Sequence, residues 1–215
     1  ERTFWDGSSS LELRVPVAAT LASEQFTAGV EARDLEFGNL AVWFKTILYE
    51  VPTGLISVGL GVAVPTASPS RVLFGQTPIL EIENQAVHLL PYLGAMSTPR
   101  ERWFWQGFLQ LDVGTNGNPV HGDVTGQSLS RFGVLQDATL LFADLGVGYS
   151  LYENAGECGL TRISPTAELH YSTTLQDTDV AASNDFLIRS PTRRFDVLNL
   201  TLGASLLWND HLWVR

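Results

Sequence analysis

The sequence has a single cysteine, Cys158, and no long run of apolar residues. One cysteine excludes a disulfide framework and a thiolate metal site. The missing apolar run excludes a transmembrane helix, because such a helix needs about 20 consecutive apolar residues. The N-terminal segment ERTFWDGSSS also lacks the charged and then apolar order of a signal peptide.

Charged residues are scarce, at 17% of the chain against about 25% in a typical soluble domain. The formal net charge is −10 at pH 7, and no cluster of Lys and Arg offsets it. This balance excludes nucleic acid as a partner, because a phosphate backbone selects basic surfaces. The four histidines show no metal-ligand spacing, so we expect neither a metal nor another cofactor.

What the sequence does contain is alternation, and the clearest example is LISVGLGVAVPTA at residues 55–67. Large apolar residues occupy one parity, and Ser57, Gly59, Gly61 and Ala63 occupy the other. A period of two predicts a strand with two different faces. Glycine weakens a strand interior, so a face in water would carry Thr, Lys or Glu instead. We therefore expect the small side chains to face a closed interior with little room.

The same alternation recurs in residues 11–21, 39–49, 86–96, 103–113, 138–152, 161–173 and 198–208, and a ninth segment begins at 211. Short links at 50–54, 97–102, 153–159 and 209–210 alternate with long ones at about 22–37, 66–85, 114–134 and 176–195. Short turns at one end and long loops at the other are typical of bacterial outer-membrane barrels. Within these segments, Tyr49 falls on the interior parity, and Pro91 predicts irregular pairing.

The predicted fold is all-β, a transmembrane antiparallel up-and-down β-barrel, or meander, that residues 1–215 form as one domain. Nine strands would place parallel neighbours at the closure, whereas single-chain barrels of this kind have an even number. We therefore expect closing residues after Arg215, and further ones before Glu1, for a barrel of about 10–12 strands.

Polar side chains fall on the parity assigned to the lumen. They are Glu12, Arg14, Lys45, Gln106, Gln110, Asp112, Asp144, Arg162, Glu168 and His170. A charge on the lipid face would be unfavourable by up to about 2–4 kcal/mol near mid-membrane, so this bias supports the assignment. Aromatic residues on the apolar parity near the short turns are predicted to lie at the lipid interface: Trp103, Trp105, Tyr149 and Trp208.

One segment carries a family resemblance. Residues 37–67, FGNLAVWFKTILYEVPTGLISVGLGVAVPTA, resemble outer-membrane transporter-like barrels of the MetA-pathway of phenol degradation type. The matching positions are Gly38-Asn39, Lys45 and Pro65-Thr66, and Ala67 stands where that family usually has Gly. The resemblance implies an outer-membrane barrel that passes small hydrophobic or polar solutes, and it supplies no catalytic residues.

Three motifs could indicate a calcium site or an enzyme, but each has a better structural explanation. Asp112 to Asp123 partly matches a calcium loop, but Gly114 has no side-chain oxygen at the third position, which favours a turn at Asn116-Gly117. The residue types of a membrane lipase occur at His170, Ser172 and Asn199, and the paired carboxylates of a glycosidase at Glu168 and Asp144. Polar lining explains both sets better, so the sequence predicts no enzyme.

The leading functional hypothesis is a passive pore or small-solute transporter of the bacterial outer membrane, with weak cation preference. Its expected partners are the lipid bilayer, lipopolysaccharide, and small solutes or ions, with a homo-oligomer or other envelope proteins as further partners. Two alternatives stay open: a non-conducting structural or surface-interaction barrel, and a soluble β-sandwich binding module.

Overall fold

A computed structural model describes residues 1–19, 35–100, 102–123, 125, 128–154, 159–189, 194–209 and 212–214. These residues form strands and turns, and they contain no helix that could cross a membrane. The predicted all-β class and the antiparallel pairing are confirmed.

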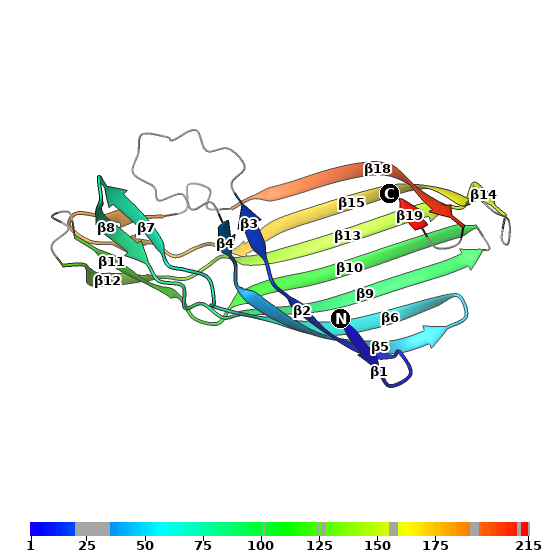
Figure 1. The fold of residues 1–215 in the computed structure, drawn as a ribbon, viewed down its shortest axis with the longest axis horizontal. Coiled ribbons are helices and arrows are strands. Elements are labelled where there is room, and N and C mark those ends of the chain that lie inside the picture. Colours follow the sequence, from blue (N-terminus) through cyan, green and yellow to red (C-terminus); the bar gives the residue numbers. More distant parts are fainter. Residues whose placement is uncertain are drawn as a thin grey trace.

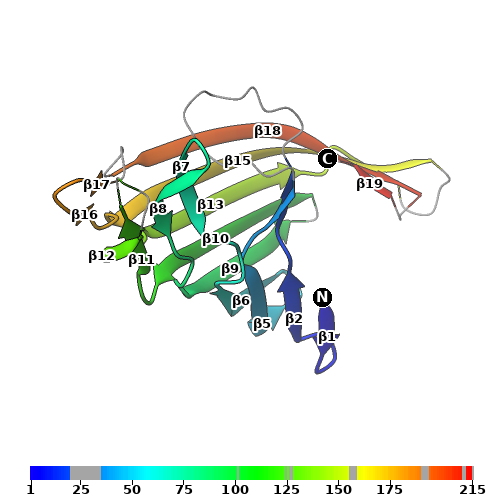
Figure 2. The same cartoon turned by 60° about the vertical axis from the view of Figure 1, so that its left-hand side comes forward.

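One large curved sheet makes up most of the molecule (Figures 1 and 2). Its strands follow in spatial order: β1 (Arg2–Phe4), β2 (Ser9–Arg14), β5 (Leu40–Val51), β6 (Gly54–Val64), β9 (His88–Arg100), β10 (Trp103–Gly114), β13 (Thr139–Tyr149), β15 (Leu160–Gln176), β18 (Asp196–Trp208) and β19 (Leu212–Val214). The short strand β14 (Tyr152–Glu153) also pairs with β15. Strands that lie side by side in this sheet also follow one another in chain order, with only short strands of other pairings between them, as the predicted meander requires.

The two ends of this sheet, β1 and β19, are not paired with each other in the described part of the chain. The sequence pattern did not predict β1, which forms a hairpin with β2. Adding β1 gives ten strands along the path, so β1 and β19 run in opposite directions. The expected parallel clash at the closure, which assumed nine strands, was therefore wrong.

Glycines on the inner face of β6 lie beneath aromatic rings of neighbouring strands. A β-carbon added to Gly61 would lie 2.7 Å from Cε2 of Trp43, and one added to Gly59 would lie 2.3 Å from Cε1 of Tyr92. Real β-carbons do not approach other atoms so closely. Glycine is therefore needed here because the rings lie flat against the sheet, which is a more specific reason than limited room alone.

Two local irregularities were predicted only in part. The register shifts between Ile47 and Tyr49, so Tyr49 pairs with Ile56 on the outer face, and its predicted interior position was wrong. Pro91 pairs with Leu60 in regular register, while its pairing with β10 is skipped and then resumes unchanged. A proline has no N–H for the ladder, so the gap lies beside the proline without a bulge.

All four of the predicted long loops contain strands. A second sheet, the loop sheet, consists of β7 (Ser70–Phe74), β8 (Thr77–Ile82), β11 (Asn118–Gly122) and β12 (Ser130–Leu135). Two short hairpins accompany it, β16 (Ala181–Ala182) with β17 (Leu187–Ile188), and β3 (Val17–Ala19) with β4 (Leu35–Phe37). The loop sheet projects beyond one end of the main sheet (Figure 1). We refer to this as the loop end, and to the opposite one as the short-turn end.

The loop sheet has a small core. Val120 is fully buried, and the stacked rings of Phe132 and Phe186, with centroids 5.8 Å apart, lie against Gly122. Ala181 of β16 is also buried and packs over Gly133. Val120 also pairs with Ile82 of β8, so three separate connections are held together here.

Candidate functional site

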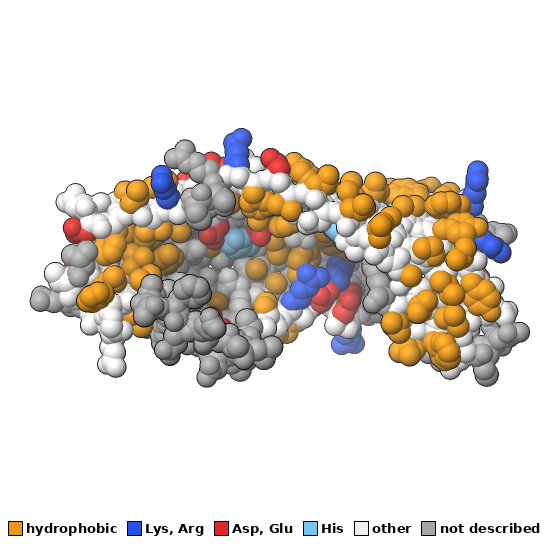
Figure 3. Space-filling view, turned by 90° about the horizontal axis from the view of Figure 1, so that it is seen from above, with side chains coloured by type: hydrophobic (Ala, Val, Ile, Leu, Met, Phe, Trp, Pro, Cys, Tyr) orange, Lys and Arg blue, Asp and Glu red, His pale blue; other side chains and the backbone are white. Residues whose placement is uncertain are grey.

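The inner face of the main sheet carries the polar side chains, and the outer face carries the apolar ones. Paired residues in antiparallel strands point to the same side, so the register fixes the faces. The row through Lys45, Gly59, Tyr92 and Gln110 lies on the inner face. All ten residues predicted to line the lumen fall on this face. Figure 3 shows charged side chains gathered in a hollow between apolar surfaces.

The first charged group joins β2 and β5. Lys45 donates from Nζ to Glu12 and, at 3.3 Å, to Oε1 of Glu1. Arg14 donates from Nε to Glu12 at 2.5 Å, and its guanidinium carbon lies 4.4 Å from the ring centroid of Trp43. The group contains two cations and two carboxylates, so it contributes no net charge to the inner face.

The second charged group joins β13 and β15. His170 lies between two carboxylates, with Nδ1 at 2.8 Å from Asp144 and Nε2 at 3.5 Å from Glu168. These side chains border a hollow of about 300 Å³, which Gln106 and Phe108 of β10 also line. The hollow therefore combines an acidic wall with an aromatic floor.

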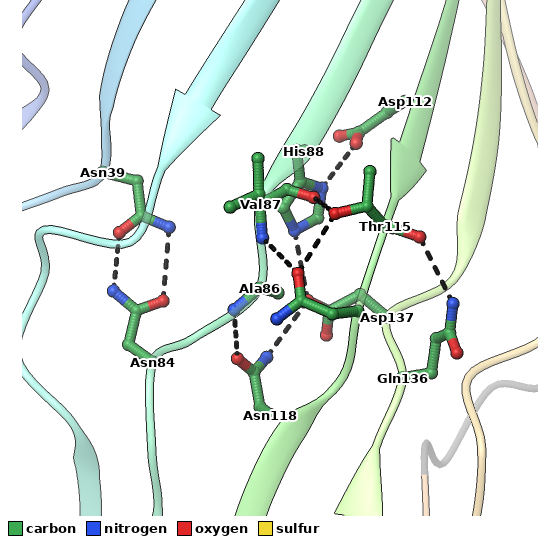
Figure 4. A network of polar contacts seen from close by, with 12 residues as sticks. Asn39, Asn84, Ala86, Val87, His88, Asp112, Thr115, Asn118, Gln136 and Asp137 are labelled. Atoms are coloured by element: carbon green, nitrogen blue, oxygen red, sulfur yellow. Dashed lines mark hydrogen bonds and ion pairs between the residues drawn. The ribbon is translucent and has the colours of Figure 1, made fainter.

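Asp112, in contrast, belongs to a polar network at the loop end (Figure 4). His88, the first residue of β9, has Nδ1 at 2.6 Å from Asp112 and Nε2 at 3.2 Å from Asp137. Both ring nitrogens face carboxylates, which suits a ring that donates from each and carries a positive charge. His88 lies at the loop end of β9, where it contacts Asp137 of the connection between β12 and β13. Its hydrogen bonds to Asp112 and Asp137 raise the pKa of His88 to about 10.

The same network fixes the loop sheet to the main sheet. The Asn118 side chain accepts from the backbone N–H groups of Gln85 and Ala86 at 2.8 Å and donates to Asp137 at 3.2 Å. Asn116 accepts from the Val87 N–H at 3.0 Å. A turn around Asn116-Gly117 was the favoured interpretation of this segment, and the amide contacts agree with it.

Arg162 lies apart from these groups, near the short-turn end. Its Nη2 donates to Oε1 of Glu153 at 2.5 Å, and its buried Nε has no hydrogen-bond partner within the described part of the protein. The ten predicted residues thus do not form one centre. They divide into the Lys45 group, the His170 hollow with Gln106, the His88 network and this position, whereas Gln110 pairs with Tyr92 and Phe142 on the inner face.

The sequence pattern missed an aromatic stripe across the inner face. Trp43, Tyr92 and Phe108 come from β5, β9 and β10, with successive ring centroids 6.0 and 5.2 Å apart. Trp43 is only 4% exposed, whereas Tyr92 and Phe108 are half-buried. The sequence signal for this stripe is the pair of glycines on β6, Gly59 and Gly61. Each leaves space for a large ring, that of Tyr92 and that of Trp43.

The outer face carries the predicted interface aromatics. Trp103 pairs with Tyr149, their rings are 5.0 Å apart, and both lie at the short-turn end. Trp105 and Trp208 are exposed on the same face. Farther along the strands, Leu60, Leu145 and Leu200 are 43%, 56% and 65% exposed, so large apolar side chains cover this face without protein around them.

The arrangement does not support the weaker chemical interpretations. Within the described ranges, no three His, Cys, Asp or Glu side chains are grouped to hold a metal ion. Asp123, the last position of the calcium-like segment, accepts from the N–H groups of Thr125 and Ser128 at 2.8 and 2.9 Å, as in a loop-stabilising turn. In the set that matches the residue types of a lipase, His170 bonds Asp144, whereas Ser172 pairs with Phe142 across the ladder.

Comparison of the chain with models of protein families, with curated proteins and with solved structures finds no match. The family resemblance of residues 37–67 therefore stays a prediction.

Proposed function

We propose that this protein is a β-barrel of the bacterial outer membrane that acts as a passive pore for ions or small solutes. The observation that carries the proposal is the division of one sheet into two faces. Exposed leucines, valines and tryptophans cover the outer face, and ion pairs, amides and hydroxyls cover the inner one. A soluble protein rarely exposes a continuous apolar surface of this extent, whereas a barrel in lipid needs one.

The aromatic residues support a membrane position with the short turns at one interface. Tryptophan and tyrosine rings favour the level of the lipid headgroups. Trp103, Trp105, Tyr149 and Trp208 lie near the short turns, and the leucines follow toward the middle of the strands. The loop sheet would then project from the opposite surface of the bilayer.

A membrane position also requires closure of the sheet. β18 pairs with β19 only through Leu206, Leu207 and Trp208, so the edge from Asp196 to Ser205 has no strand beside it within the described residues. An open edge is not tolerated in hydrocarbon, because its N–H and C=O groups would lack partners. β1 and β19 are antiparallel, so their pairing would join the two ends of the sheet beside the short turns, and full closure would also require a strand along Asp196 to Ser205.

Conductance in a planar lipid bilayer tests the proposal. We expect discrete current steps after the folded full chain is added, with the heat-modifiable gel mobility of a closed barrel as a check on folding. A chain that gives no current and does not partition into detergent would contradict the membrane pore and would favour the soluble sandwich. No second large sheet packs on the inner face in the described portion of the chain, which gives that alternative little support.

A non-conducting structural barrel is the second candidate, because ion pairs occupy part of the interior. Glu12 bonds both Lys45 and Arg14, and His170 bonds Asp144. Such pairs and the aromatic stripe fill space, as side chains do in small barrels. A protein that inserts into bilayers and passes no current would establish this candidate over the pore.

A further inference from the structure

The turn between β9 and β10 borders two adjoining hollows at the short-turn end. One hollow, of about 360 Å³, is on the outer face and is lined by Pro99, Trp103, Trp105 and Val147. The other, of about 400 Å³, is lined by polar groups that include Arg102, Ser150 and Arg162. Arg100, Trp103 and Phe104 line both, so an apolar groove and a basic hollow meet at this turn.

The charge of the basic hollow favours an anion. Arg100, Arg102 and Arg162 line it, against the carboxylate of Glu153. Glu153 bonds Nη2 of Arg162, but the buried Nε of Arg162 lacks a partner among the described residues. The turn sequence, PRERW at residues 99–103, adds one further carboxylate, so the arginines still exceed the acids by one. Guanidinium groups match phosphate oxygens in geometry and charge.

The direction of the apolar groove indicates the rest of the ligand. β10 leaves the turn at Trp103 and continues through Trp105, which pairs with Val147 of β13. The groove therefore leads from the arginines toward the middle of the strands. A ligand that fits both hollows has an anionic head and an apolar tail.

We propose that this turn binds an anionic phospholipid, with its phosphate at Arg100 and Arg102 and an acyl chain along Trp103 and Trp105. The inference rests on the proposed membrane position of the sheet. Basic residues beside a membrane each raise the local concentration of anionic lipid about fivefold. Trp side chains at the headgroup level then hold the turn at a fixed depth.

Quenching of tryptophan fluorescence by brominated lipids tests the proposal. The folded chain is inserted into vesicles of equal parts phosphatidylcholine and phosphatidylglycerol, with bromine on one lipid or the other. We expect stronger quenching by brominated phosphatidylglycerol, and loss of most of this preference in the double variant Arg100→Gln/Arg102→Gln. Glu153→Gln should increase the preference, because it removes the competing carboxylate.

The matched control is Arg71→Gln/Arg131→Gln, which removes the same charge from the loop sheet and should leave the preference unchanged. Added inorganic phosphate should not abolish the preference, because the apolar groove has no part in binding a free ion. Equal quenching by the two lipids in the parent, or an unchanged preference in the Arg100/Arg102 variant, would overturn the lipid site. Failure to insert into vesicles of any composition would instead contradict the membrane proposal itself, and the site with it.

Discussion

The ring of Phe104 on β10 lies directly over Gly148 on β13, its partner across the ladder. A β-carbon added to Gly148 would lie 2.1 Å from Cζ of that ring, and all three nearest atoms belong to Phe104. We expect Gly148→Ala to lower the free energy of unfolding by about 1–3 kcal/mol, the usual effect of overpacking. Urea unfolding followed by tryptophan fluorescence measures the loss.

A control for this change lies in the same row of the sheet. Gly203 pairs with Thr166, and a β-carbon added there would meet only Oγ1 of Thr166 at 3.5 Å. Gly203→Ala should therefore be neutral or slightly stabilising. In a Phe104→Ala background, Gly148→Ala should lose most of its effect, and an undiminished effect would show that the ring is not the cause.

Leu145→Arg tests which face contacts lipid. Leu145 is exposed on the outer face of β13, near the middle of the strand. An arginine there would be unfavourable by up to about 2–4 kcal/mol in a bilayer, so we expect a lower yield of folded protein in vesicles. Gln106→Arg, on the inner face, is the control and should insert as the parent does. Equal insertion by both variants would mean that the faces are assigned incorrectly.

Glu168→Gln tests whether the inner face lines an ion path. Glu168 borders the hollow beside His170, where a negative charge attracts cations to the path. At about 10 Å in water one charge changes the energy of an ion by about 0.4 kcal/mol, or about twofold in permeability. The ratio of cation to anion permeability, obtained from the reversal potential in a salt gradient, should therefore fall about twofold. Glu81→Gln, on the loop sheet, should leave the potential unchanged.

The network around His88 predicts a loss of stability at alkaline pH. The pKa of His88 is raised from its ordinary value of 6.5 to about 10 in the folded chain. Its contribution is therefore fully present below pH 6.5 and is lost as the pH rises toward 10. A tenfold change in proton affinity is worth about 1.4 kcal/mol, so a rise of the pKa from 6.5 to about 10 corresponds to a loss on the order of 5 kcal/mol.

Comparison with His88→Gln isolates this contribution. The difference in unfolding free energy between the parent and the variant should shrink between pH 6.5 and 10. A difference that stays constant over this range would contradict a charged His88. Other titrating groups are present in both proteins, so their effects cancel in the difference.

Cysteine cross-linking tests closure of the sheet. Arg2 and Phe4 of β1, and Leu212 and Val214 of β19, share the outer parity through their pairings with β2 and β18. In a Cys158→Ser background, Arg2→Cys/Val214→Cys and Phe4→Cys/Leu212→Cys should each oxidise to a disulfide, which requires Cα atoms about 4.4–6.8 Å apart. Arg2→Cys/Leu60→Cys should not react. If neither expected cross-link forms, β1 and β19 are not paired and the closure is contradicted.

Alternation predicted the strands and their faces, because the side chains of the inner face and those of the outer face differ sharply in polarity and size. Gln106, Asp144 and Glu168 were placed on one face by parity alone. Tyr49 was misplaced, since a bulge changes parity without leaving a clear sequence signal. The strand Arg2–Phe4 was missed because three residues are too few for a periodicity.

The grouping of the inner-face residues was beyond sequence reasoning. His170 and Asp144 come from different strands, and their contact depends on the register of β13 against β15, which parity alone leaves open to shifts of two residues. The loop sheet was missed for a similar reason. Segments such as SRVLF and NPVHG are short, and pairing between distant connections supplies most of their stability.

The core of the loop sheet sets an order for folding. Each strand of the main sheet pairs with neighbours along its path, so the sheet grows hairpin by hairpin through contacts of modest sequence separation. The core around Val120 joins connections from Ser70 to Ile188, and its contacts between connections form only when those connections lie side by side. We therefore expect it to form last, after β9, β10, β13 and β15 have brought the connections together.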